Sequence, residues 1–358
     1  MRRRVAIIGA GIGAQHLAGY QALPDRFEVV TLCDTDAERA AKVLADRNAD
    51  AGIATDLNTV LADDRIDIVD VCLPPHLHFP VATAALEAGK DVVCEKPLVA
   101  SLAQADALAD TAARTARRVT PVFQYRYGPE TARIRALQAA GLTGRAFAAS
   151  LETHWNRGAA YYAVPWRGTW ETERGGCVLG HAIHNHDLLC TIMGPVASVS
   201  ATLATRANPI ETEDCAALVF EMASGAVATS SVTLGAATDT SRLRFVFEHV
   251  TAQSGTAPYA PALGGWTFTA RDPARQAEVD AVVGGVGDVP GGFAGFFAAM
   301  ADAMDGQGDT AVTLADGRSS LELVSAIYAS DRARAPVALP IGPDHEFYQG
   351  WLPAGARI

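Results

Sequence analysis

The chain has 358 residues, a length that favours two domains over a single core. Apolar residues make up 49% of it and charged residues 19%, so we expect extensive burial and no long disordered segment. The formal net charge of −11 argues against nucleic acid or an anionic membrane as a partner, because both favour a basic surface.

The amino-terminal segment and the cysteines both indicate a cytoplasmic protein. Arg2-Arg3-Arg4 precede an apolar run that is too short for a signal peptide, and no segment approaches the roughly 20 apolar residues of a membrane span. No two cysteines form a Cys-x-x-Cys pair, so we expect reduced thiols, several of them buried in strands. The cysteines are Cys33, Cys72, Cys94, Cys177, Cys190 and Cys215.

The first third of the chain alternates short apolar runs with amphipathic stretches. This pattern predicts βαβ units on a parallel sheet that is covered on both faces. The expected strands are Val5–Ile8, Phe27–Cys33, Ile66–Leu73, Val92–Cys94 and Val119–Phe123. The expected helices are Ala14–Leu23, Asp36–Asn48, His78–Ala88 and Leu102–Thr115, with Gly89 closing the third and Ser101 capping the fourth.

The pattern changes after about Tyr125. A helix is expected near Glu130–Ala140, ending at Gly141, and alternating segments rich in Val, Thr and Ala then predict a mostly antiparallel sheet. The alternating segments are Ala197–Thr205, Ala216–Met222 and Ala226–Thr233, with a hairpin turn at Ser224-Gly225. We expect long surface loops over Ala252–Gly292 and a final helix over Leu314–Ser330. The predicted domains are residues 1–123 and 124–358.

A glycine-rich turn after the first strand indicates a dinucleotide site. Gly9-Ala10-Gly11-Ile12-Gly13 leads directly into a helix, where glycines let the backbone approach a pyrophosphate and the helix N–H groups bind it. Asp34 ends the second strand, where a carboxylate accepts the ribose hydroxyls and repels a 2′-phosphate. Because no arginine follows until Arg39, NAD is favoured over NADP. Gly9, Gly11, Ile12, Gly13 and Asp34 are the expected cofactor-binding residues of this turn.

Further motifs follow the glycine turn in a recognisable order. They are Leu73-Pro74-Pro75 with His78, Cys94-Glu95-Lys96-Pro97, Tyr125-Arg126, Trp166-Arg167, and Gly175-Gly176 through Asp187. Across nearly the whole chain this series resembles the Gfo/Idh/MocA family, named for glucose–fructose oxidoreductase, inositol dehydrogenase and a rhizopine-catabolism protein. The resemblance implies a Rossmann domain, then an α/β domain with a large, mostly antiparallel open-faced sheet that often mediates homodimers or homotetramers.

The resemblance also assigns roles in the first domain. Lys96 matches the catalytic lysine, and Pro74, His78, Glu95 and Lys96 match cofactor-binding positions. An ammonium group beside NAD⁺ has a lowered pKa, and it can stabilise a developing alkoxide. The peptide bond before Pro97 is often cis in the family.

In the second domain, His184 matches the family's catalytic histidine, and its ordinary pKa suits a base. Gly180 stands where the family has an aspartate, and we expect His181, the next residue, to replace part of its work. Asp187 matches the later aspartate. His181 and His184 also share a helix face, which leaves a metal site as a minor alternative, whereas His186 is expected to be structural.

Aromatic and basic residues between His154 and Trp170 suit a carbohydrate, because pyranose C–H faces stack on rings and cations bind hydroxyls or a carboxylate. The glycine turn also departs from the family spacing, since Gly13 and His16 each come one residue early. The expected substrate-binding residues are Arg126, His154, Trp155, Arg157, Arg167, His181 and Asp187.

These observations predict a NAD-dependent oxidoreductase acting on a secondary hydroxyl of a sugar, glycoside or cyclitol, with Lys96 and His184 as the acid/base pair. One alternative is a redox-neutral NAD-requiring glycosidase or lyase that oxidises, eliminates and then reduces. Another is a non-catalytic NAD-binding regulator, which the presence of both Lys96 and His184 disfavours.

Overall fold

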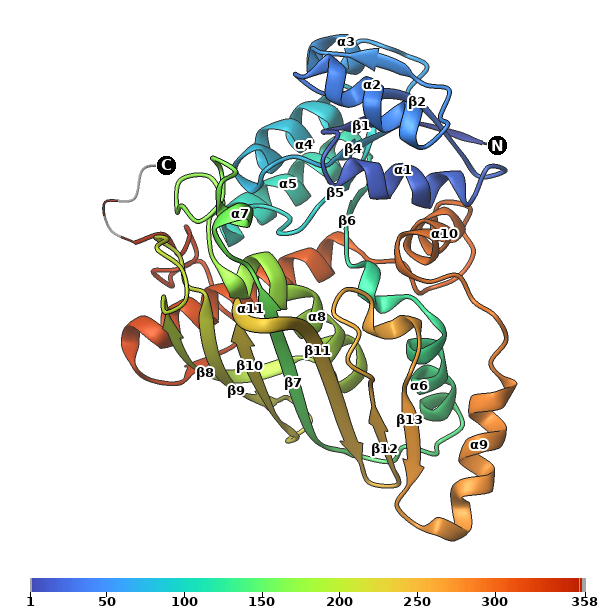
Figure 1. Cartoon of the computed structure of the whole chain (residues 1–358), viewed down its shortest axis with the longest axis vertical. Coiled ribbons are helices and arrows are strands. Elements are labelled where there is room, and N and C mark those ends of the chain that lie inside the picture. Colours follow the sequence, from blue (N-terminus) through green and yellow to red (C-terminus); the bar gives the residue numbers. More distant parts are fainter. Residues whose placement is uncertain (1, 354, 356–358) are drawn as a thin grey trace. The chain divides into compact units, whose positions relative to one another are not determined.

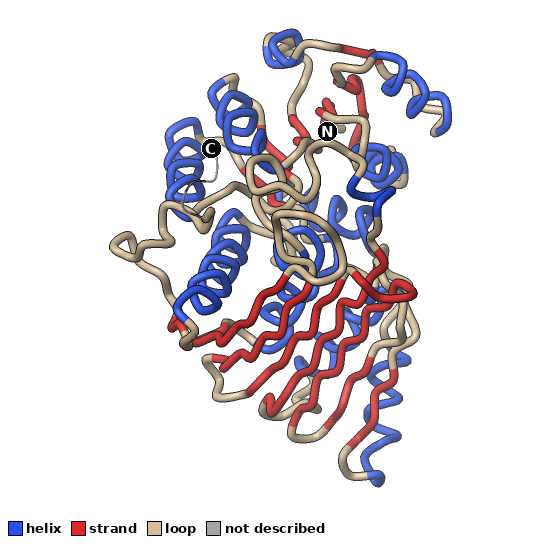
Figure 2. The backbone as a smooth tube through the Cα atoms, turned by 60° about the vertical axis from the view of Figure 1, so that its left-hand side comes forward, coloured by secondary structure: helices blue, strands red, loops and turns tan. Residues whose placement is uncertain are grey.

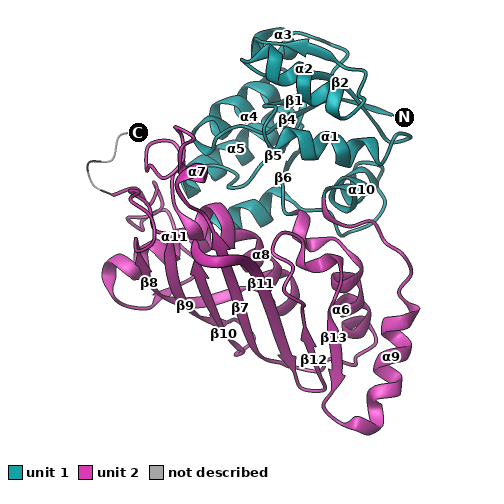
Figure 3. Cartoon of the chain, viewed as in Figure 1, with its two compact units in different colours: residues 1–123, 293–321 teal, residues 124–292, 322–358 magenta. Residues whose placement is uncertain are grey.

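The computed structural model describes residues 2–353 and 355. The chain divides into two units (Figure 3): the first contains residues 1–123 and 293–321, and the second contains residues 124–292 and 322–358. Segment 293–321 thus groups with the first unit, whereas chain order alone assigned it to the second domain. Residues 354 and 356–358, at the end of the predicted second domain, lie outside the described residues.

The first unit contains the expected parallel sheet. Its six strands lie in the order β3-β2-β1-β4-β5-β6, the doubly wound order of a Rossmann fold (Figure 1). Their bounds are Arg3–Ile8 (β1), Phe27–Cys33 (β2), Gly52–Ala54 (β3), Ile68–Val71 (β4), Asp91–Cys94 (β5) and Val119–Pro121 (β6). Only β3 was not expected, because three largely exposed residues carry no apolar run.

Four helices connect these strands where the sequence predicts them, and two short elements, α3 and η1, were not expected. Ser101 accepts a hydrogen bond from the Gln104 backbone N–H at 3.1 Å and so caps its helix, and Gly89 has the positive φ of 75° expected after a helix end. The helices are α1 (Gly13–Gln21), α2 (Ala37–Asp46), α3 (Leu57–Leu61), the 3₁₀ turn η1 (Pro75–Leu77), α4 (His78–Glu87) and α5 (Leu102–Thr115).

A distant segment completes the first unit. Helix α10 (Gly292–Met304) packs on α1, with the Tyr20 and Phe297 rings stacked 3.7 Å apart. Gly19 permits this approach, because a Cβ there would lie 2.8 Å from Phe293. The start of α11 (Leu314–Ala333) joins α5 through Arg318 and Asp106, 2.6 Å apart.

The second unit is built on an eight-stranded sheet in the order β13-β12-β11-β7-β10-β9-β8-β14. Only β7 and β10 pair in parallel; the other neighbours are antiparallel, and Figure 2 shows the strands as a broad fan. The strands are β7 (Ala146–Asn156), β8 (Val196–Ala204), β9 (Cys215–Met222), β10 (Val227–Thr233), β11 (Gly235–Phe247), β12 (Val250–Gln253), β13 (Thr267–Ala270) and β14 (Val337–Ala338).

The two faces of this sheet differ. Leu218 and Phe220 point to a buried face, whereas Val219 on the same strand is 50% exposed. Helix α8 (Ile183–Met193) packs on the buried face, because Asn185 hydrogen-bonds Thr153 and His186 hydrogen-bonds Ser230. The alternating segments therefore form an open-faced sheet, as expected.

The expectation of long loops over Ala252–Gly292 is wrong. This segment completes β12 and forms β13 and α9 (Gln276–Gly285), with short 3₁₀ turns at Pro261–Leu263 and Pro273–Arg275. The many Gly, Pro and Ala residues obscure the hydrophobic periodicity by which strands and helices are recognised. Strand β13 lies at the edge of the sheet, and it is recognised only by its pairing with β12. The remaining helices of the unit are η2 (Gln124–Arg126), α6 (Pro129–Ala139), α7 (Ala159–Tyr162) and the π-turn η3 (Val178–Ala182).

All six cysteines are free, and Cys33, Cys72, Cys94 and Cys177 are buried, as expected. Among the described residues, the structure has no helix with the length and apolar character that crossing a bilayer requires.

Candidate active site

The glycine turn between β1 and α1 has the geometry of a pyrophosphate cradle. Gly9 has a φ of 106°, and a Cβ there would lie 2.3 Å from the Cys72 carbonyl oxygen, so only glycine fits. A Cβ on Gly13 would lie 2.7 Å from the Ile7 side chain, whereas a Cβ on Gly11 would face open space. Ile12 is 42% exposed. The turn therefore fits a dinucleotide phosphate at the start of α1.

Asp34 is held in place for a ribose, but it also has a cationic partner that spacing did not predict. Its carboxylate accepts the backbone N–H groups of Ala10 at 2.7 Å and Asp36 at 2.9 Å. Arg39, one turn into α2, donates to both carboxylate oxygens. Burial acts to raise the pKa of Asp34, but Arg39 and the two N–H groups outweigh it and lower the pKa.

His16 connects the glycine turn's helix to the lysine motif. Its Nδ1 lies 2.8 Å from Asp70 and its Nε2 lies 3.0 Å from Glu95, all three side chains being buried. Burial alone acts to lower the pKa of His16, but Asp70 raises it well above the usual value, consistent with an imidazolium between two carboxylates. Sequence reasoning missed this cluster, although His16 follows the glycines at a family position.

The residues that could hold a metal ion lie around His16 and not at the predicted histidines, His181 and His184. Among the described residues, His16, Asp70 and Cys72 form a group whose ligand atoms lie within 4.8 Å of one another. Both ring nitrogens of His16 are engaged by carboxylates, so hydrogen-bonded ion pairs account for this group. No such group includes His181 or His184 within the described chain.

The lysine motif follows β5 as a braced turn. The Lys96–Pro97 peptide bond is cis, as the resemblance implies, and the Lys96 backbone N–H donates to the Glu95 carboxylate at 3.0 Å. His78 lies with Nδ1 2.7 Å from the Pro97 carbonyl oxygen and Nε2 2.8 Å from that of Leu73. Burial lowers the pKa of His78. The His78 ring therefore braces the loop after β4 and the turn at Pro97, and its cofactor contact stays a prediction.

In the second unit, the Gly175-Gly176 pair is explained by Glu213. A Cβ on Gly176 would lie 1.8 Å from the Glu213 carbonyl oxygen. The Glu213 carboxylate accepts the backbone N–H groups of Gly176 and Val178 at 3.1 Å and the Tyr328 hydroxyl at 2.9 Å. Burial raises the pKa of Glu213 to about 7. Sequence reasoning missed this residue, because no motif marks it.

The π-turn η3 and helix α8 present the predicted histidines. His184 stacks on Tyr125, with the ring centroids 4.6 Å apart, and His181 Nε2 lies 3.1 Å from the Tyr161 hydroxyl. Trp155, from the buried face of the sheet, meets the edge of the His181 ring at 5.3 Å. The two histidines are thus set among aromatic rings of the second unit.

Arg126 and Asp187, both predicted to bind substrate, bind each other in the structure. The guanidinium donates two hydrogen bonds to the carboxylate, at 2.8 and 2.6 Å, and both side chains are nearly buried. This bidentate pair joins η2 to α8 and so supports the helix that contains His184.

A second carboxylate lies beside the unusual Gly180. A Cβ at Gly180 would lie 3.8 Å from a carboxylate oxygen of Glu173, which is buried. The Glu173 carboxylate accepts hydrogen bonds from the Gly168 backbone N–H and, at 3.4 Å, from the Arg167 guanidinium. Glu173 therefore supplies negative charge beside the position of the missing aspartate. Sequence reasoning missed Glu173, although its position two residues before Gly175-Gly176 could have indicated that it lies near this motif.

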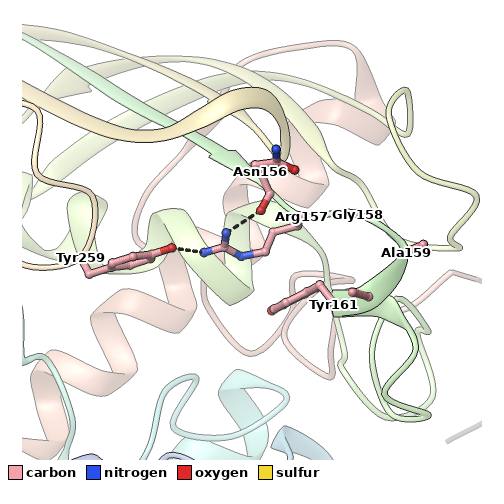
Figure 4. Close-up of a pocket in the computed structure, with 7 residues that line it drawn as sticks. Asn156, Arg157, Gly158, Ala159, Tyr161 and Tyr259 are labelled. Carbon is pink, nitrogen blue, oxygen red and sulfur yellow. Dashed lines mark hydrogen bonds between the residues drawn. The ribbon is translucent and has the colours of Figure 1, made fainter.

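An open pocket of about 630 Å³ lies in the second unit (Figure 4), and Tyr161, the neighbour of His181, forms part of its wall. Arg157 crosses it, donating to the Tyr259 hydroxyl at 2.9 Å and to the Asn156 carbonyl oxygen at 2.6 Å. Arg167 stacks on the Tyr161 ring. The lining residues are Asn156, Arg157, Gly158, Ala159, Ala160, Tyr161 and Tyr259.

His154 and His186 do not join this cluster. His154 lies on the open face of the sheet and contacts Ser231, because neighbouring strand residues point to opposite faces and Trp155 takes the buried side. His154 thus lies apart from the histidine cluster of the second unit, and its substrate contact stays a prediction. His186 hydrogen-bonds Ser230 at 2.9 Å, and burial lowers its pKa to about 4, in agreement with a structural role.

Family models match both units. A model of the oxidoreductase family's NAD-binding Rossmann fold matches residues 3–123, and the GFO/IDH/MocA C-terminal domain model matches residues 131–253. The chain belongs to the Gfo/Idh/MocA family. Its first unit is accordingly an NAD-binding Rossmann domain of an oxidoreductase.

Curated relatives of the family match part of the chain. D-glucoside 3-dehydrogenase of Escherichia coli is 31% identical over 204 residues, covering 55% of this chain and 56% of that protein. Levoglucosan dehydrogenase of Pseudarthrobacter phenanthrenivorans is 28% identical over 211 residues, covering 56% and 54%. The chain thus matches somewhat more than half the length of these relatives.

Solved structures match nearly the whole chain. The WlbA dehydrogenase of Bordetella pertussis, in complex with NADH and UDP-GlcNAcA, is 26% identical with a TM-score of 0.82, covering 95% of this chain and 98% of that one. A levoglucosan dehydrogenase complex with NADH is 21% identical with a TM-score of 0.79, covering 95% and 100%. The latter likeness supports the fold alone.

Proposed function

We propose that the chain is a NAD-dependent dehydrogenase that oxidises a secondary hydroxyl of a sugar, glycoside or cyclitol. The observation that carries the proposal is the aromatic pocket of the second unit, where the hydroxyl of the lining residue Tyr161 lies 3.1 Å from His181 Nε2. The NAD-binding family assignment of the first unit and the sugar dehydrogenases among its relatives support it.

The proposed chemistry needs one base and one electrostatic stabiliser. Bound NAD⁺, held by the glycine turn and Asp34, would supply the hydride acceptor for the carbinol carbon. His184 takes the hydroxyl proton, so that the C–O bond becomes a carbonyl, and the Lys96 ammonium stabilises the oxygen as negative charge develops. Tyr125 and the Arg126–Asp187 pair hold the histidine helix, and the Glu95 carboxylate holds the Lys96 backbone.

We also propose a homodimer or homotetramer that forms through the open face of the second sheet. Val219 and Val227 expose 50% and 52% of their surface there, on neighbouring strands β9 and β10. Exposed apolar side chains on a broad sheet face favour association. NADP is a poorer cofactor in this proposal, because Asp34 repels a 2′-phosphate.

The test is a panel of sugars, glycosides, uronates and inositols assayed with NAD⁺ and NADP⁺ by nicotinamide absorbance. Lys96→Ala and His184→Ala are expected to lower kcat/KM by roughly 10²–10⁴-fold on the best substrate, because each removes a group that acts in the transition state. Lys42→Ala and His249→Ala are the matched controls and should retain activity.

Full activity in either site variant contradicts the assigned acid/base pair. Cleavage of a glycoside without net NADH formation contradicts net oxidation and favours the redox-neutral cycle instead. Folding of each variant is checked by circular dichroism, so that loss of structure is separated from loss of chemistry.

A further inference from the structure

Arg157 is bonded to three neighbouring residues of the second unit. Its guanidinium donates to the Asn156 carbonyl oxygen, to the Tyr259 hydroxyl and to both carboxylate oxygens of Asp239, at distances of 2.6 to 3.2 Å. The side chain is only 13% exposed. Three of these four contacts come from Nη1 and one from Nη2, so the Nη1 side of the guanidinium is committed to protein groups.

The positive charges around the pocket are also neutralised. Arg157 pairs with Asp239 at 2.9 Å, and Arg167, stacked on Tyr161, pairs with Glu173 at 3.4 Å. A ligand carboxylate beside Arg157 would therefore also face the Asp239 carboxylate, and the two like charges would repel. The pairing leaves the pocket close to electrically neutral.

Arg157 instead organises the aromatic rings. Its guanidinium carbon lies 5.0 Å from the Trp155 ring, 5.4 Å from Tyr161 and 5.6 Å from Tyr259. Trp155 and Tyr259 also meet edge to face at 4.9 Å. A cation shared by three rings fixes their relative positions and leaves the ring faces as recognition elements.

We propose that this pocket binds an uncharged cyclic polyol or glycoside, and that Arg157 is a positioning residue that holds its aromatic walls. The inference rests on the proposed function and narrows its substrate class. Apolar C–H faces of the ring stack on the aromatic side chains. Uronates and sugar phosphates are disfavoured as substrates, because Arg157 and Arg167, the two arginines at the pocket, are each paired with a carboxylate.

The test compares matched glycosides that differ only at C6, methyl β-D-glucopyranoside and methyl β-D-glucuronide, with the corresponding galactoside pair. Binding to the NADH-loaded protein is measured by calorimetry, and oxidation is measured with NAD⁺. The wild-type protein should favour the neutral member of a pair by at least about 10-fold, which corresponds to about 1.4 kcal/mol.

Asp239→Asn should reduce that preference by about 10-fold, because Arg157 then has an uncompensated charge that attracts the uronate. Glu152→Gln is the matched control: it removes one negative charge from an exposed pair with Arg242 and should leave the preference unchanged. Arg157→Lys retains the charge but loses the planar fork, so it should weaken binding of the neutral glycoside without improving binding of the uronate.

Stronger wild-type binding of the uronate than of the neutral glycoside overturns the inference. An unchanged preference in Asp239→Asn also overturns it, as does the absence of binding by all four glycosides. Wild-type affinity for the neutral glycoside in Arg157→Lys overturns the positioning role. Selective binding of neutral glycosides without oxidation of any compound in the panel would contradict the proposed function alone.

Discussion

Two different physical requirements explain the residues found at the cofactor site. Gly9 is required by sterics, because any side chain would collide with the Cys72 carbonyl group. Asp34 is required by charge, and its role is larger than the spacing argument implied, since its carboxylate both accepts backbone N–H groups and neutralises Arg39. The acid therefore prevents Arg39 from receiving a 2′-phosphate.

Asp34→Ser is accordingly expected to shift cofactor choice toward NADP. The change removes a ribose acceptor and releases Arg39, so the ratio of kcat/KM for NADP⁺ to that for NAD⁺ should rise by roughly 10-fold or more. Initial rates with both cofactors measure it. Asp46→Ser removes a carboxylate from the exposed pair with Lys42 on the same helix and should leave the ratio unchanged; a constant ratio in Asp34→Ser would contradict the role of the acid.

The neighbouring residues His154 and Trp155 show that residue type alone does not decide which side chains line a site. His154 and Trp155 both suit a carbohydrate cleft, yet only Trp155 reaches the histidine cluster, because their side chains leave opposite faces of β7. The β7 strand was not predicted, so the strand alternation that separates the two residues was not available.

At the level of elements, the beginning of the π-turn and α8 depends on a buried acid from a distant segment. Glu213 binds the N–H groups of Gly176 and Val178 and is bonded by Tyr328. Burial raises its pKa to about 7 against these hydrogen bonds, so the acid is partly protonated near neutral pH.

The raised pKa of Glu213 predicts a pH-dependent stability. Because the folded state binds this proton more tightly than the unfolded state, the contribution is complete below about pH 4.5 and is lost as the pH rises through about 7. The free energy of unfolding of the wild type, minus that of Glu213→Gln, should fall over this window by on the order of 3 kcal/mol, at about 1.4 kcal/mol per unit of pKa.

Urea unfolding at a series of pH values measures this difference. Glu248→Gln is a control of opposite sign, because Arg145 lowers the pKa of Glu248 and its contribution is lost as the pH falls. A Glu213 difference that rises with pH would show that the buried carboxylate is stabilised in its charged form.

At the scale of the whole molecule, the open face of the second sheet is the expected association surface. Val219→Asp combined with Val227→Asp should yield a smaller species, because two charges are costly to bury in an apolar interface. Light scattering after gel filtration measures the mass. Ile53→Asp, which alters an exposed apolar residue of the first unit, should retain the wild-type mass; a wild-type monomer at micromolar concentration would refute the proposed oligomer.

Local pattern was sufficient for much of this protein. Five of the six parallel strands, the glycine turn and the helix cap at Ser101 follow from short-range periodicity and motifs, because each depends on neighbouring residues. The cis turn at Lys96-Pro97 was implied by the family resemblance. The alternating strands likewise predicted an open-faced sheet.

Partner choice across the chain was decided only by tertiary structure. His16 binds Glu95, 79 positions away, Arg126 binds Asp187, and segment 293–321 joins the first unit. No local pattern specifies such pairs, because a side chain meets the group that packing brings to it, and a buried charge remains charged only where packing supplies its counter-charge. The sequence therefore determined a NAD-binding oxidoreductase fold, while packing decided which of its predicted binding residues are open to a ligand and which are already bound to each other.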